Sequence, residues 1–151
     1  MSSGEEHAFV IEGKMALPYQ YFAGAVGSRF IVALRDEQKV LAVRSESTGR
    51  TLVPPRQTDD RTFEYLGDSW TEVANEGVVT GFTVIRYREP YQPKEPPYIL
   101  ALIRLDGADS AIAHIVEGVE PDAMRAGMRV RAVFAEEKRD NILAIDHFAP
   151  A

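Results

Sequence analysis

Few side chains of this sequence could carry out covalent or acid–base chemistry. Its 151 residues include three histidines, His7, His114 and His147, and no cysteine. Without cysteine, the chain cannot form disulfides, iron–sulfur clusters, thiolate zinc sites or a thiol nucleophile. The histidines are widely separated in the sequence, which argues against a histidine metal cluster. Since no Gly-x-Ser-x-Gly nucleophile motif is present either, the sequence predicts that the chain is not an enzyme on its own.

Four side chains are better candidates for contact with a ligand or a partner. Arg56 follows a double proline, which would hold its guanidinium group on a stiff turn. Arg86 and Tyr87 end one expected strand, just before a proline-rich loop, and His114 lies within another. A plainer interpretation stays open for each: Arg56 as a solvated arginine, and the other three as packing residues of their strands.

The balance of charge bears on the kind of partner. With 17 basic and 23 acidic residues, the net charge is −6 at neutral pH. Proteins that bind nucleic acid without sequence preference neutralise phosphates with basic surfaces, so this balance argues against that function. No apolar run approaches the roughly 20 residues of a membrane-spanning helix, and the polar start of the sequence is unlike a secretory signal. We therefore expect a soluble, cytoplasmic protein that makes no membrane contact.

The composition, 45% hydrophobic and 26% charged, is that of an ordinary globular protein. A packed fold must therefore position these candidate side chains. The first part of the chain, residues 1–70, is irregular. Ser28 is a suitable N-cap for a short helix, because apolar residues follow it at helical spacing. Lys39–Arg44 is typical of a strand, residues 45–50 have turn chemistry, and Thr51–Val53 would return as the second strand of a hairpin.

The second part of the chain, residues 71–151, predicts a mainly β domain. Alternating apolar residues, β-branched residues and a turn signal at residues 106–107 indicate five strands and one helical turn. The strands would cover residues 77–88, 98–105, 110–116, 128–134 and 142–148, and the helical turn residues 121–125. Gly81 is expected to form a bend or bulge. Three strands, a short helix and two further strands is the order of a five-stranded OB-fold barrel, although five strands could also form another small barrel.

Short segments along most of the chain recur, in the same order and spacing, in one known family. These segments are Ile11–Lys14, Leu17–Tyr19, Arg29–Phe30, Ala33–Asp36, Val53–Arg56, Phe82–Val84, Glu95–Tyr98, Leu105–Asp109, Gly127–Phe134 and Asn141–Phe148. In them the chain resembles the zinc-ribbon/OB-fold acyl-CoA-associated proteins, domain-of-unknown-function family 35 (DUF35). The resemblance implies an N-terminal helix and a rubredoxin-like ribbon hairpin, followed by the OB barrel.

The sequence departs from that family at the zinc ribbon. Family members carry one cysteine pair before the segment Val-Pro-Pro-Arg and a second pair after it. Alignment on Gly49 and on this segment puts Ser45, Thr48, Asp59 and Thr62 at the four ligand positions. Three hydroxyls and one carboxylate do not form a tetrahedral zinc site, so we expect a degenerate ribbon without metal. Packing against a partner chain could hold the segment in place.

The resemblance also implies a function. Members of the family are typically non-catalytic partners of thiolase-like enzymes, which include thiolases and related aldolases and synthases that act on acyl-CoA. A heterotetramer with such an enzyme is the expected form. The enzyme would supply the catalytic cysteine and histidine, and the coenzyme A thioester would be the substrate of the complex, not a cofactor of this chain. Arg56, Arg86, Tyr87 and His114 would then contact acyl-CoA or the partner.

Two alternatives stay open on the sequence alone. An OB-fold module could bind nucleic acid by stacking bases on Phe82, Tyr87, Tyr91 and Tyr98, although the acidic charge argues against this function. A relative that has lost its metal ligands could also have a purely structural role.

Overall fold

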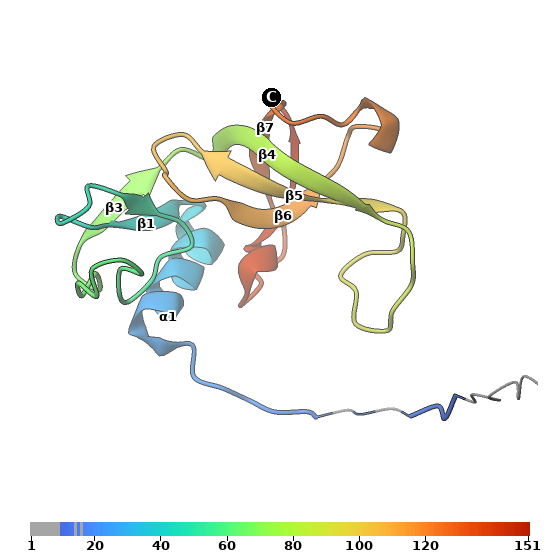
Figure 1. Ribbon diagram of the computed structural model, residues 1–151, viewed down its shortest axis with the longest axis horizontal. Helices are drawn as coiled ribbons and strands as arrows, with labels where there is room; N and C mark the ends of the chain where they lie inside the picture. The colour runs from blue at the N-terminus through green and yellow to red at the C-terminus, as the bar shows by residue number, and fades with distance from the viewer. Residues whose placement is uncertain (1–9, 14, 16) are drawn as a thin grey trace, which may run out of the picture.

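The computed structural model describes residues 10–13, 15 and 17–151. They form a helix, a small three-stranded sheet and a closed five-stranded barrel. An extended N-terminal arm, of which residues 10–13, 15 and 17–23 are described, leads away from this folded body (Figure 1). His7 and Lys14 lie outside the described residues. Within the described ranges, no helix combines the length and the apolar content that a membrane crossing requires.

The helix starts earlier than the sequence predicts. α1 (Gly24–Val32) continues as one π-helical stretch, η1 (Ala33–Glu37). The prediction of Ser28 as the N-cap is wrong, because Ser28 lies inside α1 and the true cap position supplies no side-chain hydrogen bond. Packing positions this helix, since Phe30 and Leu34 are buried and most helix stability in proteins comes from a packed apolar face.

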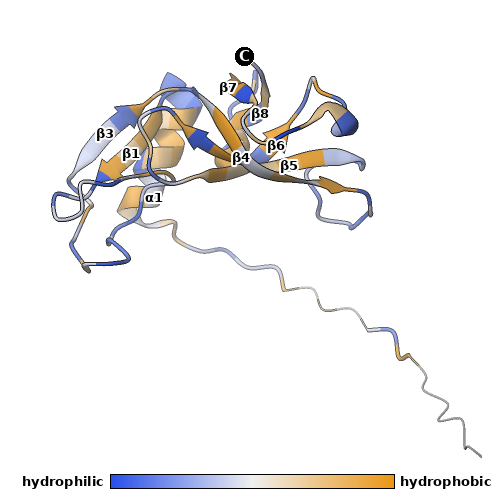
Figure 2. Ribbon diagram, turned by 45° about the horizontal axis from the view of Figure 1, so that its top comes forward, coloured by the Kyte–Doolittle hydropathy of each residue, from blue (hydrophilic) through white to orange (hydrophobic). Residues whose placement is uncertain are grey.

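A three-stranded antiparallel sheet follows, in the order β2-β1-β3. β1 (Val40–Arg44) and β2 (Thr51–Leu52) form the predicted hairpin. β3 (Trp70–Val73) was not predicted, and it pairs with β1 along its whole length. We call residues 40–73, which hold this sheet and its loops, the ribbon. In Figure 2, α1 lies next to β1, and both are coloured largely as hydrophobic.

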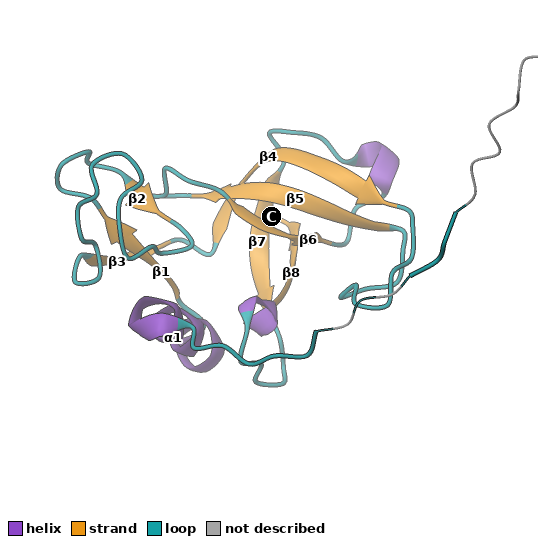
Figure 3. Ribbon diagram, turned by 60° about the horizontal axis from the view of Figure 1, so that its bottom comes forward, coloured by secondary structure: helices purple, strands orange, loops and turns teal. Residues whose placement is uncertain are grey.

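The remaining strands close into a barrel in the order β4-β5-β6-β8-β7, with β7 paired back onto β4 (Figure 3). The strands are β4 (Glu76–Ile85), β5 (Tyr98–Leu105), β6 (Ile112–Val116), β7 (Arg129–Phe134) and β8 (Ile145–Pro150). One 3-10 turn, η2 (Pro121–Ala123), lies between β6 and β7. This is the OB-fold arrangement, so the predicted fold class is confirmed.

Two details of the barrel strands trace to single residues. In β4 the register against β5 shifts between Val79 and Gly81, which is the bulge predicted at Gly81. The sequence predicts the last strand from residue 142, whereas β8 begins at Ile145. A short 3-10 turn, η3 (Ile142–Ala144), precedes it, because the Asn141 side chain accepts the Leu143 N–H at 2.8 Å and caps that turn.

One apolar core is shared by the helix, the ribbon and the barrel. Phe30 and Leu34 of the helical segment pack in the same cluster as Val40 and Val53 of the ribbon and Phe148 of the barrel. A smaller cluster within the ribbon consists of Val43, Leu52, Leu66 and Trp70. Since the larger cluster continues across all three parts, ribbon and barrel are one packed unit.

Asp109 and Ser110, in the loop between β5 and β6, join the barrel to the ribbon. Asp109 Oδ2 accepts the Thr51 N–H at 2.8 Å, and the Asp109 N–H donates to Thr51 O at 2.8 Å. Ser110 Oγ accepts the Val53 N–H at 2.7 Å and donates to Val53 O at 2.8 Å. These bonds occupy the edge of β2 that β1 leaves free, so the ribbon cannot turn away from the barrel without breaking them.

Candidate functional site

The four positions that the resemblance equates with metal ligands lie together. Thr48 Oγ1 donates to Asp59 Oδ2 at 3.2 Å, and the Thr48 N–H donates to Ser45 Oγ at 3.1 Å. The Thr62 N–H donates to Asp59 Oδ1 at 3.2 Å. Ser45 and Asp59 are fully buried, so these hydrogen bonds lie inside the ribbon.

Glu64 completes this group of residues, although no sequence motif pointed to it. Its Oε2 accepts the Ser45 hydroxyl at 2.7 Å and the Ser47 N–H at 3.1 Å, and its Oε1 accepts the Glu46 N–H at 3.1 Å. Glu64 occupies none of the ligand positions, so no spacing rule points to it. We call Ser45, Thr48, Asp59, Thr62 and Glu64 the ribbon cluster.

Both carboxylates of the ribbon cluster are stabilised in their ionised form. The hydrogen bond from the Arg61 N–H contributes most to lowering the pKa of Asp59 below its usual value. The Ser45 hydroxyl contributes most to lowering the pKa of Glu64. Hydrogen bonds to a charged carboxylate favour that form, so both groups are ionised at neutral pH.

The ribbon cluster does not fit a zinc ion. Structural zinc sites use thiolates and imidazoles, whereas this cluster offers hydroxyls and carboxylates. The hydroxyls of Ser45 and Thr48 already donate to the two carboxylates, which also accept backbone N–H groups. The chain's own hydrogen bonds thus hold residues 45–64, where the sequence favours packing against a partner.

Arg56 lies at the surface of the ribbon with one loose ion pair. Its Nη1 is 3.7 Å from Asp60 Oδ1, and the same carboxylate oxygen accepts a closer bond, 3.0 Å long, from Arg50. The Arg56 guanidinium group is therefore available for a contact from outside.

Arg86 and Tyr87 follow the end of β4, at the start of the β4–β5 loop (residues 86–97). Both are exposed, Tyr87 to 62%. The ribbon and this loop lie at opposite ends of the folded body in Figures 1 and 3. The structure therefore does not bring Arg56 together with Arg86 and Tyr87.

His114 points into the barrel. It is only 3% exposed, and its ring meets the Phe148 ring edge-on with 5.5 Å between centroids. Nδ1 accepts the Ile115 N–H at 2.9 Å, and Nε2 lies 3.3 Å from the Ile142 carbonyl oxygen, to which its proton can donate. Burial lowers the pKa of His114. In this conformation both ring nitrogens are used inside the chain, and His114 offers no polar atom to a ligand or partner.

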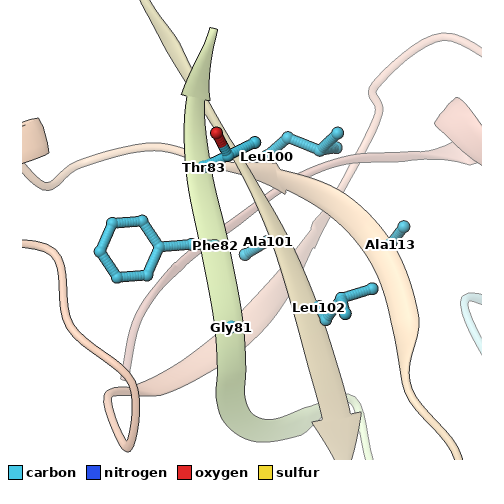
Figure 4. A pocket seen from close by; sticks show the side chains of 7 residues that line it. All are labelled: Gly81, Phe82, Thr83, Leu100, Ala101, Leu102 and Ala113. Carbon is cyan, nitrogen blue, oxygen red and sulfur yellow. The ribbon is translucent and has the colours of Figure 1, made fainter.

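An aliphatic hollow, which no sequence pattern indicated, lies on the outer face of β4, β5 and β6. Thr83, Leu100, Leu102 and Ala113 point to this side of the sheet, whereas Phe82 and Ala101 point to the other (Figure 4). The hollow has a volume of about 240 Å³, below the roughly 300–1,000 Å³ of small-molecule pockets. Its lining residues are uncharged and Leu102 is 50% exposed, so a protein surface fits it better than a small ligand.

The β4–β5 and β7–β8 loops flank the face of the barrel that OB folds use for binding. Cationic side chains of both loops form ion pairs. In the β4–β5 loop, Arg88 pairs with Glu95 at 2.9 Å. In the β7–β8 loop (residues 135–141), Lys138 pairs with Asp36 of η1 at 2.7 Å. These cations are neutralised by neighbouring carboxylates.

Glu117, Asp146 and His147 could hold a metal ion by distance alone, because their ligand atoms lie within 4.8 Å of one another. Two cationic side chains already occupy the group: Lys94 pairs with Glu117, and Arg139 pairs with Asp146 at 3.0 Å. The hydrogen bond with His147 contributes most to lowering the pKa of Asp146. The group is thus a salt-bridge network that joins both loops to β8 and to Glu117, the residue that follows β6.

The chain is an OB-fold barrel with an attached ribbon. Residues 70–135 match the family of ChsH2 C-terminal OB-fold domains. The chain is 23% identical over 107 residues to a DUF35 domain-containing scaffold protein of Methanocaldococcus jannaschii, a match that covers 71% of this chain and 75% of that protein. In these matches the chain is similar to DUF35 proteins and to ChsH2 OB-fold domains, in agreement with the resemblance of its sequence segments.

Two solved structures share the fold. One is the Ltp2-ChsH2(DUF35) aldolase, with a TM-score of 0.60 and 20% identity, where the match covers 81% of this chain and 91% of that one. The other is a DUF35 family protein of unknown function from Sulfolobus solfataricus, with a TM-score of 0.59 and 22% identity, where the match covers 73% and 78%.

Proposed function

We propose that this chain is a non-catalytic accessory subunit of a thiolase-like enzyme that acts on acyl-CoA. The aliphatic hollow is the observation on which the proposal depends, because it puts uncharged, partly exposed surface on the face that OB folds use for binding. The scaffold name of the archaeal relative and the aldolase assembly of the structural relative support the same class of function.

In the proposed complex the enzyme supplies the nucleophile and the acid–base group, and this chain supplies surface. It scaffolds the complex and helps to close the acyl-CoA site, with coenzyme A thioester as the substrate. Arg86 and Tyr87 suit the edge of that site, because they are exposed on a loop beside the OB binding face. Arg56 would contact the enzyme from the ribbon. Two enzyme chains and two accessory chains would form a heterotetramer.

Binding of nucleic acid is the less favoured function. Single-strand binders combine a positively charged groove with aromatic stacking platforms. Here the hollow is aliphatic, and Phe82 points to the other side of the sheet (Figure 4). The cations Arg88, Lys94 and Arg139 near this face are each paired with a carboxylate.

Co-purification of the tagged chain from its native cell extract tests the proposal, with mass spectrometry of the eluate and metal analysis. We expect a thiolase-like enzyme in about equal molar amount and acyl-CoA affinity in the complex. Recovery of the chain alone, as a monomer without affinity for acyl-CoA, would refute the proposal. Binding of single-stranded DNA with a steep salt dependence would favour the alternative instead.

A further inference from the structure

The described part of the N-terminal arm exposes several large apolar side chains. Its described residues form neither helix nor strand (Figure 1). The large side chains that are 72% to 91% exposed are Val10, Ile11, Met15, Leu17, Tyr19, Tyr21 and Phe22. Exposed apolar surface on this scale marks an interaction site.

Large apolar side chains recur at every second position from residue 15 to residue 21 of the arm. Met15, Leu17, Tyr19 and Tyr21 occupy every second position, and successive side chains of an extended chain point to opposite sides. The ring centroids of Tyr19 and Tyr21 lie 6.1 Å apart, which agrees with a shared face. Pro18 has no N–H to donate, so the segment is suited to pairing at a sheet edge and not within a sheet.

The size of this face matches a protein interface. Each aromatic side chain can bury roughly 150–250 Å², so Tyr19 and Tyr21 alone could contribute roughly 300–500 Å². A standard interface buries roughly 800 Å² on each partner. With Leu17 and Met15 added, the arm could supply most of one side of such an interface.

The position of the arm connects it to the proposed acyl-CoA edge. Met15, Leu17 and Pro18 line one open hollow together with Tyr91, which lies in the β4–β5 loop and is 80% exposed. The arm therefore passes beside the loop that carries Arg86 and Tyr87 (Figure 3). A partner that covers the arm would also reach this loop.

The charge distribution favours a different protein, and not a second copy of this chain, as the binding partner of the arm. Residues 15–23 contain no Asp, Glu, Lys or Arg, whereas the whole chain carries a net charge of −6. Two copies would bring two acidic bodies together, which repel each other. An uncharged extended segment fits an apolar groove with a free sheet edge, which holds alternate side chains in pockets.

We propose that the arm docks as an extended strand into such a groove of the thiolase-like enzyme, with Met15, Leu17, Tyr19 and Tyr21 buried. This inference rests on the proposed function, because it names the part of the chain that the enzyme binds.

Two matched double variants test the inference by titration against the purified enzyme subunit. Tyr19→Ser/Tyr21→Ser removes two side chains of the docking face, and Val10→Ser/Phe22→Ser removes two exposed apolar side chains at even-numbered positions. We expect the first to weaken binding roughly 100-fold and the second less than about threefold, since a few buried aromatic residues dominate interface energy. The thermal unfolding of both variants should equal that of the parent chain, because all four side chains are exposed.

The outcomes separate the two proposals. Equal binding by Tyr19→Ser/Tyr21→Ser and the parent chain overturns the docking of the arm and leaves the proposed function intact. Equal weakening by both double variants overturns the alternating face. If no thiolase-like enzyme co-purifies, the proposed function fails. In that case light scattering measures the oligomeric state of the chain. A dimer of the parent chain together with a monomer of Tyr19→Ser/Tyr21→Ser would assign the arm to a second copy and overturn the inference.

Discussion

At the scale of single residues, His114 shows how a titratable side chain becomes part of a core. The ring packs against Phe148 and both nitrogens face backbone groups of the chain. A protonated ring would bring a charge into the barrel, and it would lose the acceptor that Nδ1 offers to the Ile115 N–H. The neutral form is therefore the folded form.

This burial predicts a loss of stability in mild acid. The folded state lowers the pKa of His114 below 6.5, so the unfolded chain takes up its proton first as the pH falls through that value. The stabilisation is present above about pH 7 and decreases below about pH 6.5. We expect a lower urea midpoint at about pH 5.5 than at about pH 7.5, and a smaller difference in His114→Gln. An equal difference in both proteins would contradict this role.

The hollow makes a prediction at a second residue. Leu102→Ser removes a half-exposed leucine from the barrel face, and Val32→Ser removes a valine of similar exposure, 43%, from α1. We expect Leu102→Ser to weaken the co-purified complex at least about tenfold, because truncated apolar side chains at an interface centre cost about 1–2 kcal/mol or more. The Val32→Ser control should retain the complex. Equal affinity of the two variants would place the enzyme on another face.

At the scale of elements, β4 and β5 approach so closely that one position requires glycine. A Cβ at Gly77 would overlap the carbonyl oxygen of Arg104 and lie 2.7 Å from Leu105 Cα, whereas a Cβ at Gly81 would meet nothing within 4 Å. We expect Gly77→Ala to lower the free energy of unfolding by about 1–3 kcal/mol, as overpacking does. Gly81→Ala, in the same strand, should leave it within about 1 kcal/mol of the parent value. Urea unfolding of the two variants checks the difference.

The ribbon predicts sensitivity to acid and not to chelators. The pKa values of Asp59 and Glu64 are lowered in the folded chain, so their stabilisation is present above about pH 4 and is lost as the pH falls through the folded values. Trp70 is the only tryptophan and packs in the ribbon, so its fluorescence reports on this part. We expect the emission to shift below about pH 4 and to stay constant with EDTA. A change with EDTA, or bound zinc in equal molar amount, would mean that a metal holds the ribbon.

At the scale of the whole molecule, the Ser110–Val53 hydrogen bonds join the ribbon to the barrel, in addition to the apolar core that the two parts share. Val53 is buried, and its N–H and carbonyl oxygen both bond the Ser110 hydroxyl. Ser110→Ala leaves both groups without that partner, which should cost about 1–3 kcal/mol. Ser110→Thr keeps the hydroxyl and should lose less. Unfolding followed by Trp70 fluorescence measures the free energy of unfolding of both variants. An equal loss in Ser110→Ala and Ser110→Thr would contradict the role of the hydroxyl.

Sequence patterns predicted the barrel better than the ribbon. Alternation and turn residues are local signals, and they located all five barrel strands and the bulge at Gly81. β3 has only four residues, and it is positioned by pairing with β1, which lies about 30 residues earlier in the chain. Ser28 had the right chemistry for a cap, yet the packing of Phe30 and Leu34 placed the helix start elsewhere. Glu64 reaches the ribbon cluster from outside every expected ligand position.

The sequence by itself excluded thiol chemistry, located the five barrel strands along the chain and carried the family resemblance. Composition and local periodicity contain that information. Only the tertiary structure decided which apolar side chains are buried and which are exposed. Residues 99–103 are apolar at every position, so no alternation distinguishes the two sides of β5. Closure of the barrel turned Ile99, Ala101 and Ile103 inward and left Leu102 half-exposed, since that choice depends on which strands lie on either side.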